Sequence, residues 1–521
     1  MCLQLKISLL QLLEVLAVIS VSLVASLLLV ITIFFSLRQR YSLGETMLSP
    51  LFYFAVLWWL AFPLHAYLLD AAWVDTQQPV AVSQRDLAAA VWLSVACMLL
   101  VWRGAATGSE RLRSDVSQMQ RQEKIGWMSF MMALLISLAL IFLCQIVIQF
   151  GSLSPFVGNQ QNLSRVGSGP LFMLSELFIF GLIAIIPAIV QPHARWSSRL
   201  PLLVLFVLGL ILAVFMGIAL TSRRIMVLPL FALALAWLFM QARVSRTLST
   251  MLLLVTFLAV PSLQQFRYMF APAVFDVTAS VDSEASDQVS AKTTAAYCRF
   301  FNDRPIPQRA VVILDDFGKE RSPAEFQRNV AASFCDGQYK AWFSLQTLAT
   351  SYGLVDHLAT FLDKATPMEI IAGVDQGRAW LFNAGLALIP RAIWTDKPMH
   401  YGSVAEQKWL YPGMYANDQV TTALPPSFIL DFMFGFGVLS LVALCYGLGR
   451  LLHWTHRVLL EEKQVHNHAR FAFGLFIMSY MFNIVRGGTG FLQLVLYMAV
   501  ILVLMYGGSQ LKYFFFMRKR A

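Results

Sequence analysis

Long apolar runs separated by short basic segments are the feature that most constrains how this chain folds. A helix that crosses the roughly 30 Å of bilayer hydrocarbon needs about 20 predominantly apolar residues. Of the 521 residues, 58% are hydrophobic and only 13% are charged, and the mean hydropathy is +0.65. A soluble chain of this length needs more charge to cover its surface. The sequence therefore predicts an all-α, polytopic integral membrane protein.

We count about eleven runs of suitable length. They cover residues 15–36, 50–69, 86–102, 126–149, 170–190, 200–219, 225–241, 249–265, 427–451, 471–485 and 490–511. No small-residue cleavage pattern follows the first run, so we interpret it as an anchor rather than a removed signal peptide. The runs divide the chain into N-terminal transmembrane helices over 1–265, a large loop over 266–426, and C-terminal helices with a basic tail over 427–521.

Lysine and arginine predict the orientation, because they are enriched in cytoplasmic loops. The C-terminal tail ends in Arg518, Lys519 and Arg520 and is therefore expected in the cytoplasm. Counting back places five basic segments on the same side: 38–49, 103–125, 191–199, 242–248 and 452–470. The net charge of +10 then reflects topology and does not indicate nucleic-acid binding. The N-terminus and the loop 266–426 are expected outside.

The external loop contains moderately apolar stretches near 341–362 and 369–390. They are too polar or too short to span, so we expect helices that lie at the membrane surface. Cys298 and Cys335 are the only cysteines in this loop. In an oxidising compartment they could form a disulfide, and two unpaired thiols are the alternative.

Arginines at the predicted outer edge run against the orientation rule, since short external loops are poor in Lys and Arg. They are Arg165, Arg223, Arg224, Arg267 and Arg486, and the external loop adds Arg378 and Arg391. Charges at the membrane boundary are costly and tend to face a cavity or a partner. The planar guanidinium group matches phosphate oxygens two at a time. The pattern indicates a site for a polyanionic lipid head group; the alternative is that each arginine extends separately to the interface.

Transfer of a group to a hydroxyl needs a carboxylate or a histidine that accepts the proton. Asp431, which follows Pro425 and Pro426 just inside the run 427–451, is one candidate for this role. Other candidates in the external loop are His357, Asp375, Asp396, His400, Glu406 and Asp418.

Several types of site are absent from the sequence, including the GxxxxGK[ST] phosphate loop, HExxH, CxxC and GxSxG. The pair Asp315 and Asp316 has no spaced partners, so we expect neither a metal nor a cofactor. His453, His456, His466 and His468 lie in a predicted cytoplasmic loop, and we interpret them as solvated. The energy for any reaction must come from the substrate or from a gradient.

Five short pieces follow one another along the chain: Arg165 with Gly167 and Gly169, TSRR at 221–224, IPRAIWTDKP at 389–398, LPPSFILDFMFGFGVLS at 424–440, and VRGGTG at 485–490. Together with many spans and one large external loop late in the chain, they resemble the Wzy-type O-antigen and oligosaccharide repeat-unit polymerases. The third and fourth pieces are the most specific, whereas TSRR is also similar to a motif of O-antigen ligases.

The resemblance implies a GT-C-like fold in the bacterial inner membrane and transfer of glycan between undecaprenyl-pyrophosphate-linked oligosaccharides at the periplasmic face. No nucleotide or other cofactor is implied, because the pyrophosphate is already an activated leaving group. It implies pyrophosphate binding by Arg165, Arg223, Arg224, Arg391 and Arg486, and catalysis by Asp431 with Arg391. Relatives commonly carry Glu where Asp431 stands. A chain-length regulator and a flippase are the implied protein partners.

Three alternatives remain open at this stage. An O-antigen ligase uses the same donor but transfers glycan to lipid A core. A transporter or flippase for lipid-linked sugars is often built from two repeated halves with broken helices, and we find no such repeat. A structural partner in an envelope assembly is the third. The repeat-unit sugar, its linkage and the stereochemical course do not follow from the sequence.

Overall fold

The computed structural model of the chain is helical, with no strand in the part that it describes. The described residues are 2–71, 82–107, 125–150, 169–190, 196–219, 223–240, 246–252, 254, 353–378, 380–381, 403–410, 427–461 and 468–516. Most of the loop 266–426 lies outside these ranges. Its predicted boundaries and the disulfide between Cys298 and Cys335 therefore stay predictions.

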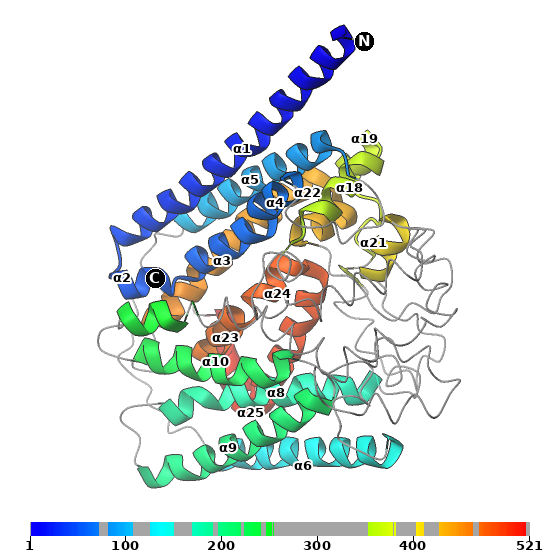
Figure 1. Cartoon of the computed structure of the whole chain (residues 1–521). Coiled ribbons are helices and arrows are strands. Elements are labelled where there is room, and N and C mark those ends of the chain that lie inside the picture. Colours follow the sequence, from blue (N-terminus) through cyan, green and yellow to red (C-terminus); the bar gives the residue numbers. More distant parts are fainter. Residues whose placement is uncertain are drawn as a thin grey trace, which may run out of the picture.

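The N-terminal part begins with α1 (Cys2–Arg38) and the short α2 (Leu43–Met47). A continuous helical rod follows, made of α3 (Pro50–Trp59), the π-helical turn η1 (Leu60–Leu64) and α4 (His65–Asp70). Pro63 lies inside η1, and a proline has no N–H for the regular helical ladder, which accounts for the wider turn at this point. α5 (Gln84–Ala106) then runs beside α1 (Figure 1).

A second group of helices packs together in the middle of the chain. It consists of α6 (Ile125–Phe150), α8 (Gly169–Val190), α9 (Trp196–Ala219) and α10 (Arg223–Met240). The C-terminal part contributes α22 (Phe428–Glu461), α23 (His468–Ser479), α24 (Met481–Arg486) and α25 (Gly488–Phe516). α22 packs on α5, whereas α23 and α25 pack on α8, so the C-terminal helices join the two groups.

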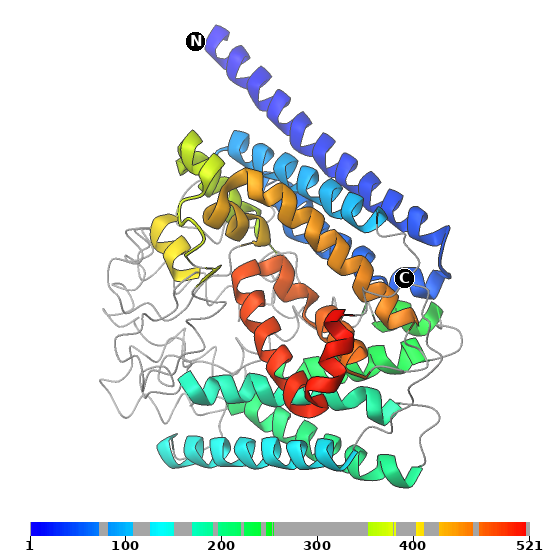
Figure 2. The same cartoon turned by 180° about the vertical axis from the view of Figure 1, so that it is seen from behind.

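Three short helices lie together at one end of the molecule, close to the start of α22: α18 (Val355–Lys364), α19 (Pro367–Ala372) and α21 (Ser403–Leu410). The opposite end carries α2 and the C-terminus (Figures 1 and 2). We call the first of these the α18 end. Residues Val355–Phe361 of α18 are all buried, whereas α19 has no buried residue.

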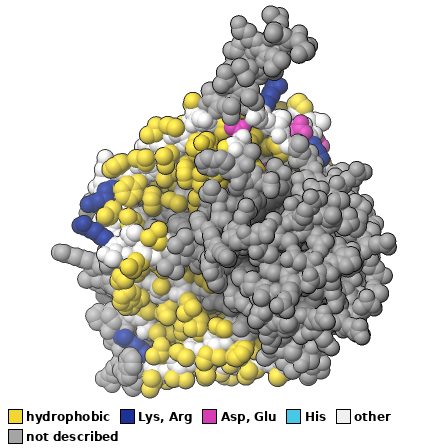
Figure 3. Space-filling view, viewed as in Figure 1, with side chains coloured by type: hydrophobic (Ala, Val, Ile, Leu, Met, Phe, Trp, Pro, Cys, Tyr) yellow, Lys and Arg dark blue, Asp and Glu magenta, His cyan; other side chains and the backbone are white. Residues whose placement is uncertain are grey.

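Within the described residues, five helical stretches are long and apolar enough to cross a membrane, by length and composition: Ile19–Arg38, Pro50–Asp70, Gln84–Ala106, Arg199–Met216 and Phe428–Leu460. Large apolar side chains are exposed along α1 and α9, and Figure 3 shows apolar side chains over much of the described surface. Such exposure is costly in water and favourable in lipid. The prediction of an all-α chain is confirmed for the described residues, and several of its helices could span a membrane.

Helices occupy each predicted run except 249–265, most of which lies outside the described residues. The count of eleven spans and the orientation stay predictions. The interpretation of the C-terminal histidines as solvated is wrong for His456 and His468, which are buried. α22 continues past residue 451 to Glu461, so His456 packs on the Tyr41 ring at 4.4 Å and lies 3.4 Å from the Ser49 hydroxyl.

The contact between α5 and α22 depends on two glycines. A Cβ at Gly449 would lie 2.0 Å from the Val101 carbonyl oxygen, and one at Gly104 would lie 2.2 Å from the Tyr446 carbonyl oxygen. Glycine lets two membrane helices approach backbone to backbone, which maximises van der Waals contact where lipid offers no hydrophobic drive. We call this contact the glycine seam.

Gly449→Ala is therefore expected to destabilise the protein by about 1–3 kcal/mol or more, because the new methyl group meets fixed backbone. Gly447 lies two residues away on the same helix, and a Cβ added there would have nothing within 4 Å, so Gly447→Ala is the matched control. That control should be neutral, or stabilising by up to about 1 kcal/mol through helix propensity. Thermal unfolding in detergent compares the two, and equal melting temperatures would contradict the glycine seam.

Candidate functional site

α22 is interrupted near the α18 end. Gly437 has φ 72° and ψ 179°, which is not helical, so the residues from Phe428 to Phe436 form a separate short helical segment. A Cβ at Gly437 would lie 2.0 Å from the Ile371 carbonyl oxygen. Only glycine combines this positive φ with such a close backbone approach. The Gly-Phe-Gly sequence at 435–437 is thus a break in the helix as well as a packing feature.

A tight turn after α19 closes the break. The backbone N–H groups of Val374 and Asp375 both donate to the Phe434 carbonyl oxygen, at 2.8 and 2.9 Å. Gly373 and Gly377 have positive φ values of 82° and 79°, which let the turn reach the broken helix. Carbonyls at a helix end need partners from outside the helix, and the turn supplies them.

Trp380 covers the same segment of α22. Its ring centroid lies 5.0 Å from that of Phe432 and 5.8 Å from that of Phe436. Its indole N–H donates to the Asp431 carbonyl oxygen at 3.5 Å. The turn and Trp380 together hold the first turns of α22 against the α18 end.

Two carboxyl groups meet beside this segment. Asp431 lies in the first turn of α22 and Glu406 lies in α21, and neither side chain is accessible to solvent. Burial raises the pKa of Glu406 well above its ordinary value of 4.5. Three further effects raise this pKa: the negative charge of Asp431, a hydrogen bond with the Asp431 side chain, and the charge of Asp375. Neither oxygen of Glu406 meets a donor in the described part of the chain, and the raised pKa favours the protonated form, whose O–H can donate to Asp431.

A second polar cluster joins α4, α18 and α24. His65, Asp356 and His357 are buried, and Asp356 Oδ1 accepts the backbone N–H of His357 at 3.0 Å. The His65 ring packs directly on Gly353, where a Cβ would lie 2.4 Å from ring atoms. Burial lowers the pKa of His357 below 6.5; Asp356 opposes this shift and the Arg486 cation adds to it. His357 is therefore neutral at neutral pH.

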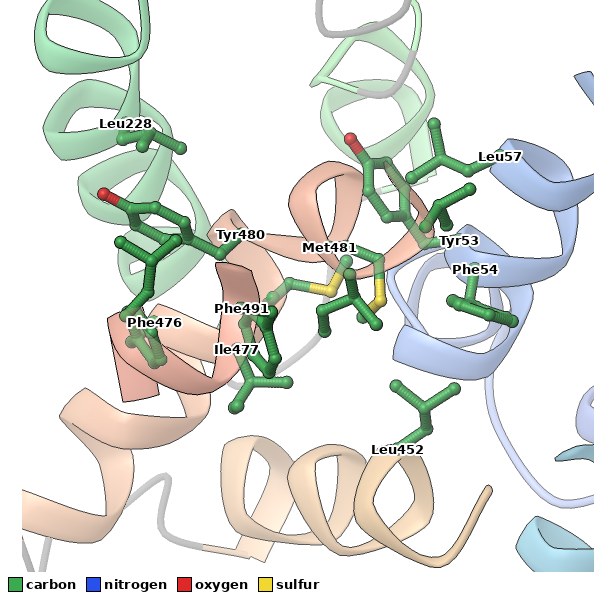
Figure 4. Packing of buried hydrophobic residues seen from close by; sticks show 14 of the residues in the cluster. Tyr53, Phe54, Leu57, Leu228, Leu452, Phe476, Ile477, Tyr480, Met481 and Phe491 are labelled. Carbon is green, nitrogen blue, oxygen red and sulfur yellow. The ribbon is translucent and has the colours of Figure 1, made fainter. Parts of the chain in front are cut away.

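Arg486 ends α24, and its guanidinium carbon lies 5.0 Å from the centroid of the Phe482 ring. The start of α24 is anchored in the core, where Met481 packs near Tyr53 and Phe54 of α3 (Figure 4). Next to it, the buried Tyr480 hydroxyl donates to Glu176 of α8 at 3.3 Å. The position of Arg486 is thus set by contacts to both groups of helices.

α18 connects the two clusters. His357 near its start belongs to the second cluster, and Lys364 at its end donates from Nζ to the Leu410 carbonyl oxygen of α21, the helix that carries Glu406. Lys364 follows His357 by seven positions, which corresponds to about 10 Å of helix. The carboxyl pair and the Arg486 cation therefore lie at the two ends of one short helix.

The structure brings together some of the site residues that the sequence predicts. Asp431 pairs with Glu406, and Arg486 lies near His357. The sequence singles out each of these four by its residue type and its place in the chain, without indicating the pairs. Arg223 and Arg224 begin α10, and their side chains are not described. Arg165 and Arg391 lie outside the described residues.

Sequence reasoning missed His65 and Asp356. His65 interrupts the apolar run 50–69, and an ionisable residue in a predicted span is a signal for a functional site. Asp356 carries no such signal, because its role depends on the packing of α18. Comparison with family models, curated proteins and solved structures finds no match for this chain. The resemblance to repeat-unit polymerases therefore depends on the five sequence pieces alone.

Proposed function

We propose that the chain is a membrane glycosyltransferase that polymerises oligosaccharide repeat units carried on undecaprenyl pyrophosphate, at the periplasmic face of the bacterial inner membrane. The observation that carries the proposal is the buried Glu406–Asp431 carboxyl pair, which α18 links to the Arg486 cation. A proton acceptor and a fixed cation are the two groups that such a transfer needs.

In the proposed reaction an acceptor sugar hydroxyl attacks the anomeric carbon of the donor. A new glycosidic C–O bond forms while the C–O bond to the pyrophosphate breaks, and the leaving group takes the bonding electrons. Asp431 accepts the proton of the hydroxyl, and Glu406 holds a second proton that keeps the two carboxyl groups together. Arg486 offsets the charge that develops on the pyrophosphate. Arg165, Arg223, Arg224 and Arg391 are proposed as further pyrophosphate ligands.

A second candidate function is proton-coupled transport of lipid-linked sugars, and the break at Gly437 is the observation in its favour. Broken helices beside proton-binding carboxyl groups are typical of secondary transporters. Transporter sites, however, lie near the middle of the membrane between repeated halves. The carboxyl pair instead lies near the start of α22, so the transferase is the better supported of the two.

Deletion of the gene followed by gel analysis of surface glycan tests the proposal. If the protein is a polymerase, the deletion strain is expected to carry only single repeat units on its surface. A full ladder that stays on the lipid carrier would instead indicate a ligase, and repeat units that remain on the cytoplasmic side would indicate a transporter. Unchanged glycan in the deletion strain would contradict all three.

A further inference from the structure

The segment Gly373–Trp380 makes several contacts to the first turns of α22. Two of its amides bind the Phe434 carbonyl oxygen, and its indole N–H binds the carbonyl oxygen of Asp431 itself. We propose that this segment, which we call the clamp, positions the Asp431 carboxyl group against Glu406. The catalytic purpose of this position rests on the proposed function. Trp380 is then a positioning residue, because it acts through Asp431.

The clamp acts on a part of α22 that the break has detached from the rest of the helix. Because Gly437 is not helical, residues 428–436 are not held in register by the helical ladder of the longer segment that follows. Asp431 lies in the first turn of this detached part. Contacts at Asp431 and at Phe434, three residues further on, fix both its rotation and its depth.

The fit between the two backbones is close enough to fix their register. A Cβ at Gly373 would lie 2.8 Å from the carbonyl carbon and oxygen of Gly435, and one at Gly435 would lie 3.0 Å from the Trp380 ring. At Gly377 a Cβ would lie 2.4 Å from the Phe436 ring. A shift of the clamp along α22 would bring these groups into collision, so it holds Asp431 in one place.

Among the described residues, the charges that act on Glu406 come from two elements. α22 contributes Asp431 and the clamp contributes Asp375. The ammonium group of Lys364 in α18 is hydrogen-bonded to the Leu410 carbonyl oxygen of α21. Asp375 and Asp431 both favour the protonated form of Glu406. Loosening the clamp moves two negative charges away from Glu406, so Glu406 releases its proton at lower pH.

Infrared titration of the full-length protein in lipid nanodiscs tests the clamp without any substrate. Protonated carboxyl groups absorb at a different infrared frequency from carboxylates. The band of the protonated form that is lost in Glu406→Gln therefore belongs to Glu406. Trp380→Ala is expected to move the titration midpoint of this band to lower pH. Trp380→Phe keeps the aromatic contacts but loses the indole N–H, and is expected to give a smaller shift in the same direction. Trp237→Ala is the matched control, since Trp237 is 53% exposed on α10.

An unchanged midpoint in folded Trp380→Phe and Trp380→Ala would overturn the proposal, as would a wild-type spectrum that Glu406→Gln does not alter. If Trp380→Ala does not fold, Trp380→Phe alone decides. The readout involves no glycan, so it is separate from the gel assay of the proposed function. The two results can therefore differ. If the infrared midpoint shifts as expected but the surface glycan of an Asp431→Asn strain is normal, the clamp is supported and the polymerase assignment is contradicted.

Discussion

Asp431→Asn is expected to abolish glycan polymerisation, with a transfer rate lowered about 10²- to 10⁴-fold, as for the loss of a general base. The asparagine amide cannot accept the proton of the acceptor hydroxyl. Glu406→Gln should cost less, because its amide N–H still donates to the Asp431 carboxylate. The rates are measured by glycan gel and by transfer between lipid-linked oligosaccharides in membrane vesicles. Equal activity of Asp431→Asn and wild type, at equal protein levels, would remove Asp431 from the mechanism.

Stability provides the control for this pair, and its sign follows from the raised pKa of Glu406. The folded protein holds this proton more strongly than the unfolded chain does, so stability falls as the pH rises from 4.5 through the raised pKa. Glu406→Gln removes this loss and is expected to be more stable than wild type at alkaline pH. Asp363→Asn, on the exposed side of α18, should change neither stability nor transfer.

The positions of most helices could be predicted, because an apolar run is a local property that can be read from consecutive residues. α5 and α8 occupy the runs 86–102 and 170–190 with small extensions. The end of α22 was less predictable: polar residues such as His453 and His456 suggested a loop, yet the helix continues because His456 finds partners on Tyr41 and Ser49. The burial of this side chain extends the helix, and the hydropathy of the sequence does not indicate that burial.

The candidate site was only partly predictable. Asp431, Glu406, His357 and Arg486 have residue types that suit the chemistry, so they could be named in advance. Their pairing could not, because it depends on how α18, α21 and α24 dock on residues far away in the chain. The break at Gly437 is an intermediate case. The Gly-Phe-Gly sequence permits it, but the positive φ is stabilised by amides of Val374 and Asp375, more than fifty residues earlier.

Arg486→Gln is expected to lower transfer about 10²- to 10³-fold, the usual cost of losing one group that stabilises developing negative charge. Arg486→Lys keeps the charge but loses the planar fork that binds two phosphate oxygens, so it should fall between Arg486→Gln and wild type. Because Arg486 contributes to the low pKa of His357, the glutamine variant should also raise that pKa, whereas the lysine variant should leave it nearly unchanged. Transfer is measured in vesicles, and the His357 pKa by NMR of labelled histidine assigned with His357→Gln.

Arg450 provides the control for the charge, since it is exposed on α22 away from the α18 end. Arg450→Gln should alter neither transfer nor the His357 titration. A His357 pKa that rises in Arg486→Gln without any loss of transfer would mean that the cation acts on His357 but not on the substrate. A loss of transfer in both Arg486→Gln and Arg486→Lys, with the His357 shift confined to the former, would mean that the fork rather than the charge is needed, as expected for a ligand of a diphosphate.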